Sequence, residues 1–395
     1  MNPIDELITR RIDTILPTKS QLRSTLVSGK KIKLYQGFDP SRPDLHIGHL
    51  VGLLQLKDFQ KLGHQVIFLI GDFTGMIGDP TDKSATRPKL TRQEVQQNAQ
   101  TYRNQASRIL DFDGPNPALM KFNSEWLDQL KFADLIELAS NFTVQQMIER
   151  DMFQQRLKNN SPIYLHEFLY PLMVTKDAQA LAVDLEIGGN DQLFNMSVGR
   201  NYLKQTINKN KFVMTTKLLT DSQGKKIGKT TGNAVNLFQD CLNTFGQIMA
   251  FPDDSIINTF TLATQVPLSE IESLKDLVLT NPMQAKKKLA LEITSLCHGM
   301  DAALKAQEHF ESTIQNKQLP ANIPTINLKL NNKITVSDLV NIGLTQSGGE
   351  LKRLIKQGGV ELNHKKVASP EDLFCLNNGD IIKIGKRNYY QVIFV

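Results

Sequence analysis

The 395-residue sequence predicts an α/β protein with a doubly wound parallel sheet, followed by an α-helical region and a small α+β module. Three observations predict this architecture: short apolar runs that end in Gly or Asp, helical repeats that connect them, and a change of pattern after about residue 240. Buried parallel strands are near-continuous apolar runs, and alternating strands and helices are typical of such sheets. These sheets bind ligands at the carboxyl ends of their strands.

The first half of the chain supplies the strand–turn–helix units. Residues 31–38 (KIKLYQGF) and 65–72 (QVIFLIGD) have the pattern of buried strands. Between them, residues 49–62 carry apolar side chains at helical spacing and end before a glycine, as many helices do. Residues 180–192 (ALAVDLEIGGNDQ) repeat the pattern with a strand and a Gly-Gly turn, and residues 192–204 then form a helix.

The second half of the chain has a different pattern. Four segments have helical periodicity, residues 243–250, 255–264, 268–279 and 282–316. Residues 318–332 hold two prolines and little periodicity, so we expect a linker there. In the remainder we expect two short helices, residues 336–342 and 349–357, and then strands within residues 358–367, 379–385 and 389–395.

Composition excludes several classes of protein. Mean hydropathy is −0.27, and no apolar stretch reaches the ~18 residues that a membrane span needs. The charged N-terminal segment lacks the apolar core of a secretory signal. The three cysteines lie far apart in the sequence, which argues against a disulfide framework and against a cysteine-based metal site. We therefore expect a cytoplasmic protein.

The net charge is small but unevenly placed. Lys and Arg number 46 against 40 Asp and Glu, which gives +6, and many soluble proteins carry as much. Residues 331–395 hold nine basic and six acidic residues, so half of the net charge lies in the last sixth of the chain. A solvated surface is one explanation. The other is RNA binding, because Lys352, Arg353 and Lys356 fall on one predicted helix, where they would meet phosphates.

A first motif follows the predicted strand 31–38. After Gly37-Phe38-Asp39-Pro40 comes a loop, and His46-Ile47-Gly48-His49 then opens a helix. A helix start offers unpaired N–H groups and a dipole that favour phosphate. Histidines there add donors that stabilise charge on a departing phosphate, and a glycine allows close approach of a base or ribose. Two surface histidines are the alternative, which the preceding strand and turn disfavour.

A second motif spans residues 221–233, DSQGKKIGKTTGN. Its three lysines and three glycines predict a cationic loop that closes over a triphosphate and opens again. The loop lacks the GxxxxGK[ST] spacing of a P-loop, so a P-loop NTPase is disfavoured. By itself the segment is also compatible with an ordinary basic surface loop. It becomes evidence for a triphosphate site because it occurs together with the first motif.

Together, HIGH at residues 46–49 and KIGKT at 226–230 resemble the HIGH and KMSKS motifs of class I aminoacyl-tRNA synthetases. Further segments resemble the bacterial-type tyrosyl-tRNA synthetases: Tyr35-x-Gly-Phe-Asp, Gly78-Asp79-Pro80, Leu169-Tyr170-Pro171 with Asp177, and Gly188-Gly189-Asn190-Asp191-Gln192. Residues 347–363 resemble an S4 RNA-binding domain. The resemblance covers nearly the whole chain, in the family's order.

The resemblance implies a role for each matching position. Tyr35 and Asp177 would bracket the phenol hydroxyl of tyrosine, Asp79 and Tyr170 would hold its ammonium group, and Gln192 would face its carboxyl group. The contacts to ATP would come from Gly37, Asp39, Ser41, His46, Gly48, His49, Gly189, Asp191, Lys226 and Lys229. The catalytic residues that act on the leaving pyrophosphate would be His46, His49, Lys226, Lys229 and Thr230.

The implied activity is ATP-dependent attachment of L-tyrosine to tRNA(Tyr) through a tyrosyl-adenylate. Mg²⁺ would accompany ATP, and the sequence has no HExxH or Cys/His cluster that predicts a structural metal. The implied domains are a Rossmann-like catalytic domain (1–235), an α-helical domain on the anticodon side (236–320), a linker (321–333) and an S4-like domain (334–395). A homodimer is implied chiefly by the family, with residues 50–62 and a long helical segment, 123–157, as candidate surfaces.

One position departs from the family pattern. Val174 stands where tyrosyl enzymes usually have a glutamine that helps to bind the α-amino group, so we hypothesise weaker binding of the amino acid. Two alternatives therefore stay open. One is another class I ligase, tryptophanyl being the nearest, although Asp177 opposite Tyr35 favours a phenol over an indole. The other is an RNA-binding paralogue without catalysis, which would have no need of a pyrophosphate clamp.

Overall fold

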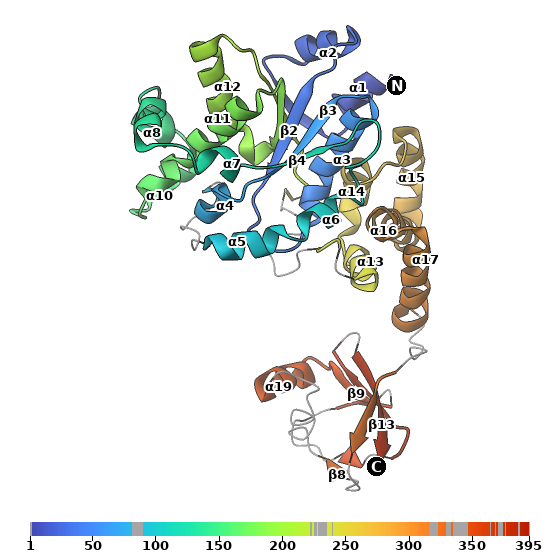
Figure 1. The fold of residues 1–395 in the computed structure, drawn as a ribbon. Helices are drawn as coiled ribbons and strands as arrows, with labels where there is room; N and C mark the ends of the chain where they lie inside the picture. Colours follow the sequence, from blue (N-terminus) through green and yellow to red (C-terminus); the bar gives the residue numbers. More distant parts are fainter. Residues whose placement is uncertain are drawn as a thin grey trace. The chain divides into compact units, whose positions relative to one another are not determined.

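The computed structural model describes two compact units, Met1–Gln307 and Glu308–Val395 (Figure 1). In the first unit the described residues are 2–80, 90–221, 223–224, 227, 235–238 and 240–307. In the second they are 308–315, 323–328, 333–334, 347–363, 365–367, 369, 374–375, 377–385 and 388–394.

A six-stranded sheet forms the centre of the first unit. Its strands are β1 (Ile12–Leu16), β2 (Lys33–Phe38), β3 (Gln65–Ile70), β4 (Leu119–Phe122), β5 (Leu185–Gly189) and β6 (Phe212–Thr216). The spatial order is β1-β6-β5-β2-β3-β4. Only β1 runs antiparallel, against β6, and the other neighbours are parallel. The doubly wound parallel sheet predicted from the sequence is therefore confirmed.

Helices cover both faces of this sheet. α3 (Ile47–Lys61) connects β2 to β3 on one side, whereas α11 (Tyr170–Leu181) and α12 (Leu193–Ile207) lie on the other (Figure 1). The chain thus leaves β2 in one direction and β5 in the other, which opens a crevice at the carboxyl ends of these two neighbouring strands. The other helices before β6 are short: α1 (Pro3–Leu7), α2 (Lys19–Val27), α4 (Thr74–Ile77), α5 (Arg92–Ala99), α6 (Tyr102–Ala106), η1 (Leu165–Phe168) and η2 (Asn190–Gln192).

The segment 123–157 is not one long helix, as the sequence suggested. It contains four helices, α7 (Ser124–Leu127), α8 (Phe132–Ala139), α9 (Val144–Ile148) and α10 (Asp151–Lys158). The start of α9 shows one reason for the breaks. The Thr143 hydroxyl accepts a hydrogen bond from the Gln146 backbone N–H at 3.2 Å, which caps a new helix inside the apolar periodicity.

The region after β6 is helical, as predicted. It contains α13 (Cys241–Met249), η3 (Asp253–Ser255), α14 (Ile256–Ala263), α15 (Leu268–Thr280), α16 (Pro282–His298), α17 (Met300–His309) and η4 (Phe310–Gln315). The helix expected over 282–316 is interrupted at Gly299, whose φ of +86° lies in the left-handed region and ends α16. Residues 236–307 belong to the same compact unit as the sheet. The domain boundary predicted after residue 235 stays a prediction.

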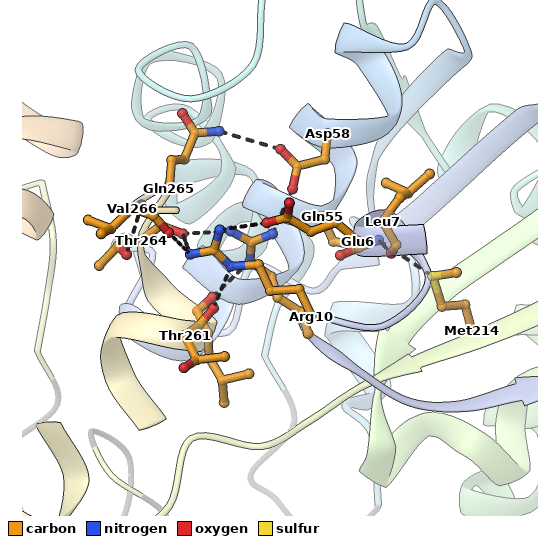
Figure 2. A network of polar contacts seen from close by, with 12 residues as sticks. Glu6, Leu7, Arg10, Gln55, Asp58, Met214, Thr261, Thr264, Gln265 and Val266 are labelled. Carbon is orange, nitrogen blue, oxygen red and sulfur yellow. Dashed lines mark hydrogen bonds and ion pairs between the residues drawn. The ribbon is translucent and has the colours of Figure 1, made fainter. Parts of the chain in front are cut away.

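Two buried arginines, Arg10 and Arg11, connect the N-terminal segment to the end of α14, and Figure 2 shows Arg10 beside Thr261 and Thr264. Arg10 donates to the backbone oxygens of Thr261, Thr264 and Val266. Arg11 donates to Leu262 O at 3.0 Å and to Thr264 O at 2.6 Å, and it forms an ion pair with Asp58 of α3 at 2.6 Å. The last carbonyls of a helix have no partner within it, and here the two guanidinium groups supply one.

The second unit is a small α+β module. After η4, its described residues include the helix α19 (Gly348–Lys356), and its main sheet has the order β10-β9-β12-β13-β7. Those strands are β7 (Thr325–Leu328), β9 (Val360–Leu362), β10 (Lys365–Lys366), β12 (Ile381–Ile384) and β13 (Asn388–Phe394). A second pair joins β8 (Lys333–Ile334) and β11 (Phe374–Cys375). The apolar face of α19 packs on the main sheet through Leu351 and Ile355.

The linker prediction needs one correction. Residues 325–328 lie within the expected linker 321–333, yet they form β7, which pairs in parallel with β13. The partner strand begins at residue 388, so the pairing is far from local and the prolines nearby hid it. The helix expected over 336–342 lies outside the described residues. Among the described residues, no helix combines the length and the apolar content that crossing a bilayer requires.

Candidate active site

A cavity of about 240 Å³ opens at the carboxyl ends of β2 and β5. Thirteen of the site residues predicted from the sequence line this cavity: Tyr35, Gly37, Asp39, Ser41, His46, Gly48, His49, Asp79, Tyr170, Asp177, Gly189, Asp191 and Gln192. These residues come from segments far apart in the chain, and the parallel sheet brings them together because its strand ends share one edge. The predicted Lys226, Lys229 and Thr230 lie outside the described residues.

Two buried groups form the floor of this cavity. Tyr35 is 2% exposed, and its hydroxyl has no hydrogen-bond partner among the described residues. Asp177 is 4% exposed and accepts from Trp126 Nε1 at 2.8 Å and Asn123 Nδ2 at 3.2 Å. Burial raises the pKa of the Asp177 carboxyl to about 8, although the two donors oppose the rise. The floor therefore pairs a hydroxyl that has no partner among the described residues with a carboxyl group whose oxygens can still accept.

Asp39 links the end of β2 to the opposite wall. Its carboxylate accepts from the Tyr170 hydroxyl at 2.8 Å and from Thr74 Oγ1 at 2.7 Å. Burial, and then the neighbouring carboxylates led by Asp39, raise the pKa of the Tyr170 hydroxyl well above its ordinary value. This hydroxyl therefore remains a neutral donor, and it fixes the orientation of Asp39.

Asp79 lies on the side of the cavity between two partners. It accepts a short hydrogen bond from Gln192 Nε2, and the Arg150 guanidinium is 4.0 Å from its carboxylate. The Gln192 side-chain oxygen in turn accepts from Asn195 Nδ2 at 2.9 Å, which fixes the amide orientation. The structure thus brings together two of the residues expected to face the ammonium and carboxyl groups of an amino acid.

The two histidines of the first motif cap α3. His46 Nδ1 accepts from the Gly48 backbone N–H at 3.1 Å, and His49 Nδ1 accepts from the His46 backbone N–H at 3.1 Å. Their rings stack with centroids 3.8 Å apart. Because Nδ1 is the acceptor in both neutral rings, Nε2 carries the hydrogen and is the donor. A side chain at Gly48 would meet the His46 ring at 3.0 Å, which explains the glycine.

The segment after the lysine loop pairs with the first motif. His46 and Asn236 form an antiparallel bridge, with Ile47 N donating to Val235 O at 3.1 Å and Leu237 N donating to Leu45 O at 3.2 Å. Within the loop, Ile227 lines the cavity and donates its backbone N–H to Leu219 O at 2.8 Å. The two motifs, about 180 residues apart in sequence, therefore meet at this cavity.

Several polar residues of the site were not predicted from the sequence. Thr74, Asn123 and Glu186 line the cavity, and Trp126 donates to Asp177 from beside it. A signal for two of them was present, because Asn123-Ser-Glu-Trp126 directly follows β4 at the same edge of the sheet. Glu186 lies within an apolar run, where a lone carboxylate gives no pattern.

The cations predicted to contact RNA share one exposed face in the second unit. Lys352, Arg353 and Lys356 are exposed on α19, whose opposite side is buried. Arg353 and Lys356 lie in the last turn of this helix, where cations also interact favourably with the helix dipole.

Comparison with known proteins identifies the family. Residues 28–315 match the model of "tRNA synthetases class I (W and Y)". This match spans the whole cavity and well over half of the chain. The chain belongs to this family. The class I assignment made from the HIGH and KIGKT segments is therefore confirmed.

Curated relatives extend the match over the whole length. The chain is 38% identical over 395 residues to the tyrosine–tRNA ligase of Aquifex aeolicus, covering 100% of both chains. It is 40% identical to the tyrosine–tRNA ligase of Thermotoga maritima, covering 99% of this chain and 98% of the relative. The prediction of a bacterial-type tyrosyl-tRNA synthetase is thereby confirmed, and the tryptophanyl alternative finds no support in these relatives.

Solved structures agree on the fold of the synthetase. A truncated mitochondrial tyrosyl-tRNA synthetase of Coccidioides posadasii superposes with a TM-score of 0.65 at 24% identity, covering 78% of this chain and 91% of that chain. A tyrosyl-tRNA synthetase of Archaeoglobus fulgidus, solved with L-tyrosine, gives 0.59 at 19% identity, covering 77% and 98%. The S4 assignment of the second unit stays a prediction from sequence.

Proposed function

We propose that this synthetase attaches L-tyrosine to tRNA(Tyr) at the cavity between β2 and β5, in an ATP-dependent reaction with a tyrosyl-adenylate intermediate. The observation that carries the proposal is the floor formed by Tyr35 and Asp177. A phenol hydroxyl donates to the Asp177 carboxylate and accepts from the Tyr35 hydroxyl, so both buried groups gain a partner. Phenylalanine would leave the Tyr35 hydroxyl without a partner and would give Asp177 no donor beyond Trp126 and Asn123, which is the kind of mismatch that gives strong rejection.

The amino-acid backbone lies against the side of the cavity. Asp79 and Tyr170 receive the ammonium group, and Gln192 faces the carboxyl group. Val174 lines the same wall and offers no hydrogen-bond acceptor there. The negative charge of Asp79 therefore supplies most of the attraction for the ammonium group, and we propose that tyrosine binds more weakly than it would with a glutamine at this position.

ATP occupies the part of the cavity between Gly189 and the start of α3. Gly37, Gly189, Asp39 and Asp191 contact its adenosine and ribose. Ser41, Gly48, His46 and His49 lie beside its phosphates, together with Lys226, Lys229 and Thr230 of the lysine loop. ATP enters as its Mg²⁺ complex, and we assign the ion to the substrate because Mg²⁺ commonly binds through substrate phosphates.

The chemical step needs positioning more than acid–base catalysis. The tyrosine carboxylate attacks the α-phosphorus of ATP, the bond to the bridging oxygen breaks, and pyrophosphate leaves. The Nε2–H groups of the two histidines and the lysine ammonium groups stabilise the charge that grows on the pyrophosphate. A hydroxyl of the terminal tRNA adenosine then attacks the tyrosyl carbonyl carbon and displaces AMP.

The second unit supplies contacts to tRNA. Lys352, Arg353 and Lys356 place three cations on one face of α19, and phosphate contacts of this kind give affinity that depends on salt more than on sequence. An S4-like domain at residues 334–395 fits this role. The helices after residue 235 then form the anticodon-side domain.

We also propose a cytoplasmic homodimer. Large apolar side chains are exposed on neighbouring short segments between α8 and η1: Phe132 (77%), Ile136 (55%), Val144 (64%), Leu157 (49%) and Leu165 (79%). Exposed apolar surface of this extent is unfavourable in a monomer, whereas an isologous contact with a second copy would bury these side chains. Replacing Leu165 by Glu should convert the dimer into monomers in sedimentation experiments, and an unchanged dimer would exclude this face.

Pyrophosphate exchange into ATP, assayed with each of the twenty amino acids, tests the proposed activity. Exchange with tyrosine alone is the expected result. Exchange with tryptophan would favour the related ligase, and no exchange would leave an RNA-binding protein without catalysis.

A further inference from the structure

The loop over residues 40–45, which leads from β2 to the HIGH motif, is held by side chains of α5, α6 and the turn between them. Pro40 and Pro43 have no N–H, so the loop itself offers few donors for its carbonyl groups. Neighbouring side chains supply them: Asn98 Nδ2 donates to Pro40 O at 2.9 Å, the Tyr102 hydroxyl donates to Arg42 O at 2.9 Å, and Thr101 Oγ1 donates to Pro43 O at 2.6 Å. The course of the loop is therefore set from outside the two motifs.

Gln105 of α6 holds the residue directly before His46. Gln105 is 7% exposed, its side-chain oxygen accepts from the Leu45 N–H at 2.8 Å, and its amide nitrogen donates to Pro43 O at 2.8 Å. The same nitrogen donates to Thr101 Oγ1 at 2.7 Å, which fixes the orientation of the amide. Gln105 does not line the cavity, so any effect that it has on the reaction passes through the loop that it holds.

The backbone on either side of His46 has contacts to two other parts of the chain. Leu45 O accepts from Leu237 N at 3.2 Å and Ile47 N donates to Val235 O at 3.1 Å, so one set of contacts comes from the segment after the lysine loop. The other set comes from Gln105, through the Leu45 N–H. If the Gln105 contacts were lost, the start of α3 would be placed by the segment after the lysine loop and by its own capping bonds.

We propose that Gln105 is a positioning residue for adenylate formation, because it holds the loop 40–45 and thereby places Ser41 and His46 beside the phosphates of ATP. Ser41 lies within this loop, His46 directly follows it, and both line the cavity. Without the Gln105 amide the Leu45 N–H loses this acceptor, and Pro43 O keeps the Thr101 hydroxyl as its donor. A displacement of about 1 Å of the groups that contact a reacting substrate can cost about 100-fold in rate.

The tyrosine end of the cavity does not depend on this loop. Asp39, which precedes the loop, is held separately by the Tyr170 hydroxyl and by Thr74 Oγ1. Tyr35 and Asp177 of the floor lie on β2 and α11. Loss of the Gln105 contacts should therefore slow the chemistry at the phosphates and leave the binding of tyrosine unchanged.

The Gln105→Met variant tests this inference in the full-length protein. Methionine keeps the length of the side chain and forms neither bond to the loop, and stoichiometric binding of tyrosine counts the active sites. Rapid-quench kinetics should show that the rate constant for tyrosyl-adenylate formation falls about 10- to 100-fold, with the affinity for tyrosine within about twofold of normal. An unchanged rate constant per active site would overturn the proposal, and so would an equal loss of tyrosine affinity.

The second chemical step gives a readout that general loosening of the fold would not spare. Enzyme-bound tyrosyl-adenylate, freed of pyrophosphate, is mixed with tRNA(Tyr), and transfer of the tyrosyl group is followed in a single turnover. No pyrophosphate leaves in this step, so Gln105→Met should transfer the tyrosyl group at a rate within about threefold of normal. A transfer rate that falls as much as adenylate formation would overturn the proposal.

A second variant keeps the test decisive if Gln105→Met does not fold. Thr101→Val combined with Tyr102→Phe removes the hydroxyl donors to Pro43 O and Arg42 O, while both side chains keep their shape. The loop loses two hydrogen bonds, and adenylate formation should slow about fivefold or more. Normal adenylate formation in this double variant would show that the loop keeps its place without these side chains, and it would overturn the proposal.

Gln60, near the other end of α3, is a matched control. It is 6% exposed, its side-chain oxygen accepts from Asp111 N at 3.1 Å, and its amide donates to Asp111 O at 2.6 Å and to Asn116 O at 3.0 Å. It does not line the cavity. Gln60→Met should lower the Tm and leave the rate of adenylate formation within about twofold of normal. An equal loss of rate in this control would assign the effect to general loosening and overturn the proposal.

This inference rests on the proposed function, and the two fail differently. Failure of the proposed function would abolish adenylate formation with tyrosine in the unmodified protein. Failure of this inference leaves that reaction intact and leaves Gln105→Met as fast as the unmodified protein.

Discussion

The indole nitrogen of Trp126 donates a hydrogen bond to the buried Asp177 carboxylate at 2.8 Å. Trp126 lies on α7, directly after β4, and Asp177 lies on α11, so the bond crosses the pocket floor between two elements 51 residues apart. It favours the ionised form of this carboxyl and so opposes the rise in its pKa that burial causes. The ability of Asp177 to accept from a phenol therefore depends on a residue outside the recognised motifs.

Trp126→Phe should weaken tyrosine binding. The change removes one donor to a buried carboxylate, a loss of about 1.5–3 kcal/mol, which corresponds to about 10- to 100-fold in KM for tyrosine. The KM for ATP should not change, because the indole acts on Asp177, which belongs to the proposed tyrosine site. Steady-state pyrophosphate exchange measures both constants, and an unchanged KM for tyrosine would contradict the role given to this bond.

Asp177→Asn should alter how stability depends on pH. The pKa of this carboxyl is raised from 3.8 to about 8 in the folded chain, so the folded state binds a proton more tightly than the unfolded state. The stability gained in this way is full below about pH 4 and is lost as the pH rises towards 8. Asparagine cannot ionise, so the variant does not lose this stability as the pH rises. The Tm of the Asp177→Asn variant should therefore exceed that of the unmodified protein by more at pH 8 than at pH 5.

Melting curves at several pH values, recorded without ligand, test this expectation. A Tm difference that is constant across that range would show that Asp177 does not titrate there. The same variant should lose most of its exchange with tyrosine, because one carboxylate oxygen becomes an NH2 donor that faces the donor of Trp126 or Asn123.

Much of the site was predictable because its motifs are local. The Gly37-Phe38-Asp39 turn, the histidines at the start of α3 and the Gly188-Gly189 turn each follow a strand, and a parallel sheet gathers strand ends at one edge. Glu186 and Gln105 were not predictable in this way. Glu186 is a single charge within an apolar strand, and Gln105 contacts Leu45 across 60 residues of sequence, so no local pattern reports either position.

Several predicted details of the fold were wrong because they also depend on contacts that are not local in the sequence. Strand β7 pairs with β13, more than fifty residues further along the chain, and no local pattern encodes that partner. The interruptions within 123–157 and at Gly299 depend on capping contacts and on one positive φ angle, which apolar periodicity does not report. Local sequence therefore predicted the presence of elements better than their ends and their distant partners.

Val174→Gln should strengthen tyrosine binding. Val174 lines the cavity beside Tyr170 and packs against the cluster of Leu127 and Met173. A glutamine oxygen there would accept a hydrogen bond from the ammonium group, and a bond to a charged group contributes about 1.5–3 kcal/mol. We expect KM for tyrosine to fall by about tenfold. Val174→Leu is the control for changed packing, and an equal effect in both variants would exclude the hydrogen bond.

His49→Ala should slow adenylate formation with little effect on tyrosine binding. Loss of one donor that stabilises developing charge typically costs about 10²–10³ in kcat. The substitution also removes the acceptor for the His46 N–H at the start of α3. His49→Asn restores a cap acceptor but not the reach of the imidazole, so rapid-quench kinetics of this variant should remain slow while its Tm recovers. Normal rates in His49→Asn would leave the histidine a purely structural role.

Arg11→Met should destabilise the first unit far more than a surface substitution nearby. The guanidinium satisfies two carbonyls at the end of α14 and the Asp58 carboxylate of α3, and its side chain is 1% exposed. Without it, the Leu262 carbonyl and the Asp58 carboxylate lose this donor and the Thr264 carbonyl keeps only that of Arg10, which we expect to lower the free energy of unfolding by about 2–4 kcal/mol. Arg23→Met is the matched control, because Arg23 forms an exposed ion pair with Asp5, a type of contact worth about 0–1 kcal/mol. Chemical denaturation of both variants measures the difference. Equal losses would mean that the carbonyls at the end of α14 find other partners, and that the connection between the N-terminal segment, α3 and the helical region does not depend on this arginine.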